Sequence, residues 1–127
     1  KPRRESVYAS LRDFLQFCST YKTMQHLKMV QGANDLINKI DTFKWEVEKH
    51  GPLDMPDVEQ LIENATKKAW QLQRLLDRLT GPNPQPLDKG FETAEDNLDT
   101  VIDWFGAKKK ELKDIFEPYL RITQQRH

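Results

Sequence analysis

The sequence predicts an all-α fold, an antiparallel bundle in which three long helices pack with a shorter N-terminal helix to form a four-helix bundle. Apolar residues recur every three or four positions over long stretches, which is the spacing of one face of an α-helix. Residues that break helices are gathered at Gly51–Pro52 and in the segment 81–86, and only 5 of the 127 residues are glycine. These breaks divide the chain into a few long helices.

The first helix is predicted over residues 6–18, after a flexible basic tail at residues 1–5, with Ser6 as its N-cap. Its apolar stripe consists of Val7, Leu11, Phe14, Leu15 and Cys18. This helix either folds back onto the bundle or pairs with another chain. Folding back is favoured because Trp45 and Trp70 lie off the stripes of their own helices, and a fourth helix would cover them.

The three long helices are predicted at about residues 20–50, 55–80 and 88–117, with a linker at 81–87. The stripe of the middle one is the most regular and consists of Val58, Leu61, Ile62, Ala65, Ala69, Leu72, Leu75, Leu76 and Leu79. A proline inside a helix removes a backbone donor, so Pro118 is expected to end or kink the last helix. Matched lengths and short connections favour antiparallel neighbours.

A chain of 127 residues corresponds to a single domain, and we expect residues 1–127 to form one helical bundle. In their length and in the heptad-like spacing of their apolar residues, the three helices after Thr20 resemble a spectrin-type repeat or a syntaxin-type N-terminal bundle. This resemblance concerns architecture alone and implies a spectrin-like three-helix core as a variant of the fold. It carries no functional residue over to this sequence.

The charge balance excludes some classes of partner. The 20 Lys and Arg residues are matched by 20 Asp and Glu residues, and a nucleic-acid binder would show a basic surplus. No apolar run is long enough to span a membrane, and the few clustered lysines in a charge-neutral domain do not lead us to expect membrane contact. The single cysteine, Cys18, cannot form an internal disulfide, which favours a cytoplasmic location. Because the chain begins with Lys1, we expect it to be part of a larger intracellular protein.

The sequence does not predict an enzyme. It has no glycine-rich phosphate loop, no pair of cysteines and no His-Glu-x-x-His metal motif. Cys18 lies on an apolar stripe, where a buried and unreactive thiol is the common case. We therefore expect no catalytic residue, no metal site and no cofactor.

The candidates for partner binding are aromatic and charged residues on the helix faces. Trp70 and Trp45 are the first, because tryptophan is enriched among residues that dominate binding energy. An acidic ribbon and a small basic cluster on the last helix add Glu92, Asp96, Asp99 and Asp103, together with Lys109 and Lys110. Ser6 follows Arg3-Arg4-Glu5, a spacing that basophilic kinases accept, and is a candidate for phosphorylation.

These features favour a non-catalytic protein–protein interaction or scaffolding module that binds another protein through its helix faces. One alternative is self-association, with a homodimer formed through residues 6–18. A second alternative is a peripheral bundle that binds anionic lipid through the basic cluster. The sequence alone does not identify the partner.

Overall fold

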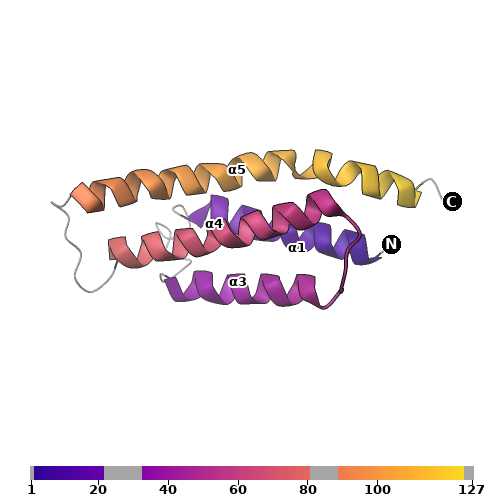
Figure 1. The fold of residues 1–127 in the computed structure, drawn as a ribbon, viewed down its shortest axis with the longest axis horizontal. Helices are drawn as coiled ribbons and strands as arrows, with labels where there is room; N and C mark the ends of the chain where they lie inside the picture. The colour runs from indigo at the N-terminus through magenta and orange to yellow at the C-terminus, as the bar shows by residue number, and fades with distance from the viewer. Residues whose placement is uncertain (1, 22–32, 81–88, 125–127) are drawn as a thin grey trace.

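The computed structural model describes residues 2–21, 33–80 and 89–124, with side chains described at 4–21, 35–77 and 96–119. In these segments the chain forms the helices α1 (Pro2–Ser19), α3 (Ala33–Glu48), α4 (Pro56–Thr80) and α5 (Lys89–Gln124). The predicted all-α bundle is confirmed. Each helix runs opposite in direction to the one before it, and α5 extends along the whole bundle (Figure 1). Both α1 and α4 pack against α5, and α3 packs against α4 and α1.

The N-terminal helix folds back onto the bundle, as predicted, and buries its whole apolar stripe. The prediction of a flexible tail at residues 1–5 was wrong, because α1 begins at Pro2. Proline is tolerated in the first turn of a helix, and a distant contact holds this turn. The guanidinium of Arg4 donates a hydrogen bond to the Tyr119 carbonyl at 3.0 Å and lies 5.7 Å from the centre of that ring. Ser6 therefore lies inside the helix and is not its N-cap.

The middle of the chain partly matches the prediction. The helix expected at 20–50 is described from Ala33 to Glu48, and residues 22–32 lie outside the described part. After this helix the chain turns at Gly51, whose φ of 69° is the left-handed conformation typical of a residue just beyond a helix end. The helix expected at 55–80 is confirmed as Pro56–Thr80. The predicted linker at 81–87 falls outside the described residues.

The last helix continues past Pro118, so the predicted end at residue 117 was wrong. Pro118 removes one helical hydrogen bond, at a cost of about 3 kcal/mol in a helix interior. Packing on both sides of it compensates for this loss. Phe116 is fully buried and meets the ring of Tyr8 edge-on at 5.0 Å, and Tyr119 contacts Arg4. Contacts with α1 therefore hold the final turns of α5.

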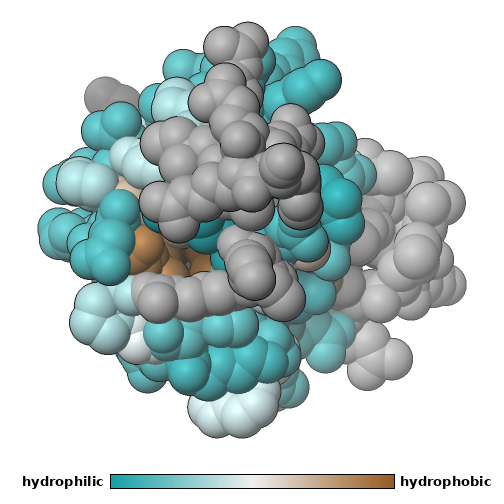
Figure 2. All heavy atoms as spheres, turned by 90° about the vertical axis from the view of Figure 1, so that its right-hand side faces the viewer, coloured by the Kyte–Doolittle hydropathy of each residue, from teal (hydrophilic) through white to brown (hydrophobic). Residues whose placement is uncertain are grey.

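The core is apolar throughout the described part of the chain, where no polar or charged side chain is buried. At its centre Phe14 of α1 stacks on Phe43 of α3, with ring centres 4.2 Å apart, and meets Phe105 of α5 edge-on at 6.2 Å. From one end of the bundle, hydrophobic surface is visible in a recess beside hydrophilic side chains (Figure 2). Because α1 completes this core, the three-helix spectrin-like variant does not describe the fold.

Candidate functional site

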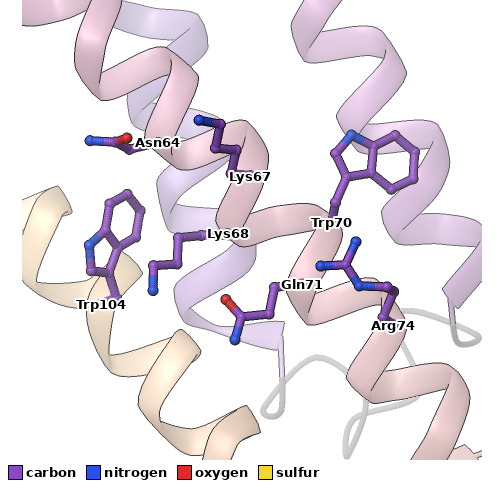
Figure 3. A pocket seen from close by; sticks show the side chains of 7 residues that line it. All are labelled: Asn64, Lys67, Lys68, Trp70, Gln71, Arg74 and Trp104. Carbon is purple, nitrogen blue, oxygen red and sulfur yellow. The ribbon is translucent and has the colours of Figure 1, made fainter.

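The side of α4 that faces away from the core carries a row of polar residues. Its buried stripe includes Val58, Leu61, Ala65, Ala69, Leu72 and Leu76. Five polar residues recur at helical spacing on the side away from this stripe, and with two tryptophans they line a shallow groove of about 610 Å³ (Figure 3). The lining residues, which we call the α4 face, are Asn64, Lys67, Lys68, Trp70, Gln71, Arg74 and Trp104.

Two indole rings flank this groove. Trp70 comes from α4 itself and Trp104 comes from α5, and their rings lie on opposite sides of the polar residues (Figure 3). Both side chains are partly buried and pack against the core. Trp104 also meets Phe105 edge-on, with ring centres 5.1 Å apart. The packed side of each ring fixes its position, while the other side borders the groove.

Two lysine side chains lie near the Trp104 ring. The Nζ atom of Lys68 lies 5.9 Å from the ring centre, and Nζ of Lys108, one turn further along α5, lies 5.8 Å from it. These distances fall within the range of attraction between a cation and the negative face of an aromatic ring. The indole therefore concentrates positive charge at one wall of the groove.

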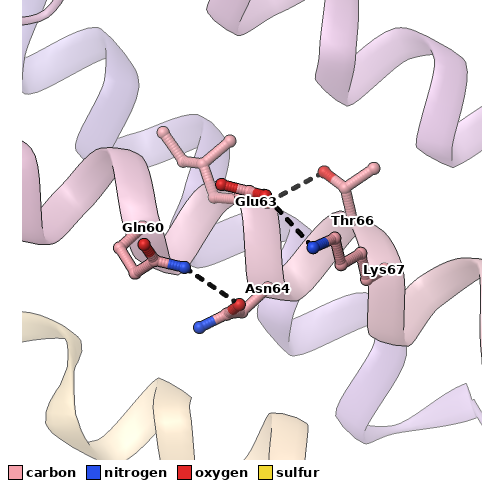
Figure 4. A network of polar contacts seen from close by, with 6 residues as sticks. Gln60, Glu63, Asn64, Thr66 and Lys67 are labelled. Carbon is pink, nitrogen blue, oxygen red and sulfur yellow. Dashed lines mark hydrogen bonds and ion pairs between the residues drawn. The ribbon is translucent and has the colours of Figure 1, made fainter.

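At the N-terminal end of the α4 face, side chains four positions apart interact with one another (Figure 4). Lys67 forms an ion pair with Glu63 one turn earlier, at 3.1 Å. The amide of Gln60 donates a hydrogen bond to Asn64 at 3.2 Å. At the other end of the face, Arg74 is exposed and makes no ion pair with any residue in the described part of the chain. Within the described part of the chain, no carboxylate competes with an external anion for the Arg74 guanidinium.

Trp45 lies apart from this groove. The expectation that the N-terminal helix would cover it was wrong, because 62% of its surface is exposed. Trp45 is exposed because α1 packs on Phe43, which lies on the other side of α3. A residue two positions after Phe43 lies about 200° further round the helix axis. Lys49 lies over the exposed indole at 4.9 Å and also pairs with Glu46 at 2.9 Å.

The remaining candidates do not join the α4 face. Asp96, Asp99 and Asp103 are exposed on α5, and the side chain of Glu92 lies outside the described residues. Lys109 and Lys110 are also exposed on α5, and Ser6 is exposed on α1. The structure thus places Trp70 in the lining of one groove with Lys67, Lys68, Arg74 and Trp104. Sequence reasoning did not propose this basic group as a binding site, although positions 64, 67, 68, 71 and 74 already have the spacing of one helix face.

Cys18 is buried, and burial raises the pKa of its thiol, an effect that the nearby charge of Lys39 opposes only in part. The thiolate is the reactive form of cysteine. Because burial disfavours the thiolate and blocks access to the sulfur, this group is suited to packing. Among the described residues, no three His, Cys, Asp or Glu side chains are grouped to hold a metal ion.

The thiol of Cys18 is expected to react with a disulfide reagent at pH 8 on the order of 100-fold more slowly in the folded chain than in denaturant. The native pKa is raised, so the unfolded chain releases its thiol proton first as pH increases. Stability should therefore decrease above about pH 8.5. The control is a Cys18→Ser chain that carries Ser6→Cys, whose exposed thiol should react at the same rate folded or unfolded. Equal rates for native and denatured Cys18 would contradict the burial argument.

No family model, no curated protein and no solved structure matches this chain. Within the described segments, no helix combines the length and apolarity needed to cross a membrane.

Proposed function

We propose that the chain is a non-catalytic protein–protein interaction module, part of a larger cytoplasmic protein, and that it binds its partner through the α4 face. The observation that carries this proposal is the pair of partly buried indoles, Trp70 and Trp104, on either side of an exposed cationic groove. Tryptophan and arginine are the residues most enriched among those that dominate binding energy. The α4 face contains both.

The rigidity of the α4 face supports this assignment. Binding requires that side chains lose rotational freedom, typically at about 0.5–1.5 kcal/mol for each flexible side chain. Here the indole of Trp104 already packs on Phe105, and the ring in turn holds Lys68 and Lys108. Much of that ordering is thus complete before a partner arrives. Trp45 is less suited to this role, because it is largely exposed and its neighbouring charges, Glu46 and Lys49, are already paired.

A photo-crosslinking residue placed at Gln71 tests the proposal directly, because Gln71 lies in the middle of the α4 face. In cells that express the full-length protein, we expect Gln71 to give a specific protein adduct. A matched probe at Asp41, exposed on α3, should not give that adduct.

Trp104→Ala should reduce the Gln71 adduct at least about tenfold, as expected for the loss of a dominant binding residue. Trp45→Ala is the matched control and should leave the adduct unchanged. Identical adducts from Gln71 and Asp41, or no adduct at Gln71, would show that the α4 face is not an interface.

A further inference from the structure

We propose that the α4 face binds an acidic amphipathic helix of the partner, an inference that rests on the proposed function and specifies the chemistry of the partner. The charge of the groove is the first argument. Its polar lining consists of the cations Lys67, Lys68 and Arg74 and the neutral amides Asn64 and Gln71, without a carboxylate. Lys108 also lies at the Trp104 wall, where its charge is shared with Glu111 at 3.4 Å. A partner segment with negative charge is therefore complementary to this surface.

These cations can still form hydrogen bonds with a ligand. Arg74 is exposed and has no ion-pair partner among the described residues, and a guanidinium can bind a carboxylate through two parallel hydrogen bonds. Lys68 contacts an aromatic ring rather than an acid, and this contact leaves room for its ammonium group to donate to an external acceptor. Lys67 already shares its charge with Glu63. We therefore expect Lys68 and Arg74 to make the main contacts with carboxylates.

The spacing of the groove favours a helical ligand. Lys68, Gln71 and Arg74 follow one another at intervals of three residues, so they form a row about 9 Å long at 1.5 Å per residue. On a partner helix, carboxylates six or seven residues apart are separated by about 9–10.5 Å along the axis, which matches the separation of Lys68 and Arg74. The indoles on both sides offer contacts to its apolar side chains. A peptide that binds by adding a β-strand would instead need the free edge of a sheet, and the described segments are helical.

A broad anionic surface fits the α4 face less well than a narrow helix does. Asp103 is the neighbour of Trp104 in the chain, and it is exposed on α5 together with Asp96 and Asp99. A membrane or a nucleic-acid duplex that covered the groove would also approach these carboxylates and be repelled by them. A helix that lies along α4 contacts only a strip of the surface. The charge distribution therefore favours a peptide over a lipid bilayer.

The test uses a synthetic helical peptide that has glutamates and leucines on one face, and a matched peptide in which glutamine replaces every glutamate. Binding to the full chain is measured by fluorescence anisotropy. We expect the glutamate peptide to bind at least about tenfold more tightly, and its affinity to decrease as salt is added. The double variant Lys68→Glu with Arg74→Glu should weaken this binding at least about tenfold.

The matched control is Lys109→Glu with Lys113→Glu, which makes the same change in net charge at two exposed positions outside the groove. It should weaken binding of the glutamate peptide by less than about threefold, and thermal unfolding should show that both double variants are folded. Equal binding of the two peptides, or equal losses in the two variants, would overturn the inference. So would stronger binding to phosphatidylserine vesicles than to the peptide.

The adduct at Gln71 separates failure of this inference from failure of the proposed function. Mass spectrometry identifies the partner segment that is joined to the probe. An acidic helical segment supports the inference. A neutral or basic segment would overturn it and leave the interaction function intact, whereas the absence of a Gln71 adduct would overturn the function itself.

Discussion

Replacing Phe14 with alanine is expected to lower the free energy of unfolding by about 3–5 kcal/mol, the range found for large aromatic side chains removed from a packed core. Phe14 is 1% exposed and contacts rings from two other helices, stacking on Phe43 and meeting Phe105 edge-on. The substitution removes both aromatic contacts and leaves a cavity where α1, α3 and α5 meet. Urea denaturation followed by circular dichroism measures the change.

Trp45→Ala is the matched control for Phe14→Ala, because it also truncates a large aromatic residue, at a site that is 62% exposed. Its effect should stay below about 1 kcal/mol, since little apolar surface is buried there. The difference between the two variants isolates the contribution of burial. Similar losses in both would show that Phe14 does not lie at the centre of the core.

The sequence predicts α4 well because its signals are local. Pro56 fits the first turn, and the buried positions Leu61, Ala65 and Leu72 recur at helical spacing up to Leu76. These signals operate within one helix and need no knowledge of its neighbours. The bundle class follows from the same patterns, because each long amphipathic helix must bury one face against another.

The errors at the two ends of the chain have a common cause. Local rules favour a tail before Ser6 and a helix end at Pro118, but contacts between the ends stabilise both segments. Arg4 of α1 binds the carbonyl of Tyr119 in α5, and Tyr8 packs on Phe116. These partners are more than a hundred positions apart in the sequence, so no local pattern reveals them.

The candidate site was predictable only in part. Trp70 stands out because it lies off the apolar stripe of its helix, and it does border the groove. The presence of Trp104 in the same groove, beside Lys68, depends on how α4 and α5 align, which a single sequence does not specify. The same limit explains why the sequence did not predict the exposure of Trp45. Which side of α3 the helix α1 covers is decided by the packing of Phe14 on Phe43.

Replacing Leu11 with aspartate is expected to destabilise the fold by about 4 kcal/mol at neutral pH. Leu11 is fully buried on the face of α1 that packs into the bundle, and the described core contains no charged side chain that could form an ion pair with a carboxylate. Burial raises the pKa of a carboxyl group by up to about 3–5 units, and each unit corresponds to about 1.4 kcal/mol. The unfolded chain would release the proton near pH 4 while the folded chain retained it. Stability should therefore decrease from about pH 4 upward, until the folded carboxyl also ionises.

The control for Leu11→Asp is Gln16→Asp, which introduces the same group at an exposed position of the same helix and should change stability by less than about 1 kcal/mol.

Thermal melting over a hundredfold range of protein concentration tests whether the chain associates with itself through α1. Because α1 packs within its own chain, the melting temperature should not depend on concentration. A melting temperature that increases with concentration would favour exchange of α1 between two chains. A small effect of Leu11→Asp would show that α1 does not pack as described.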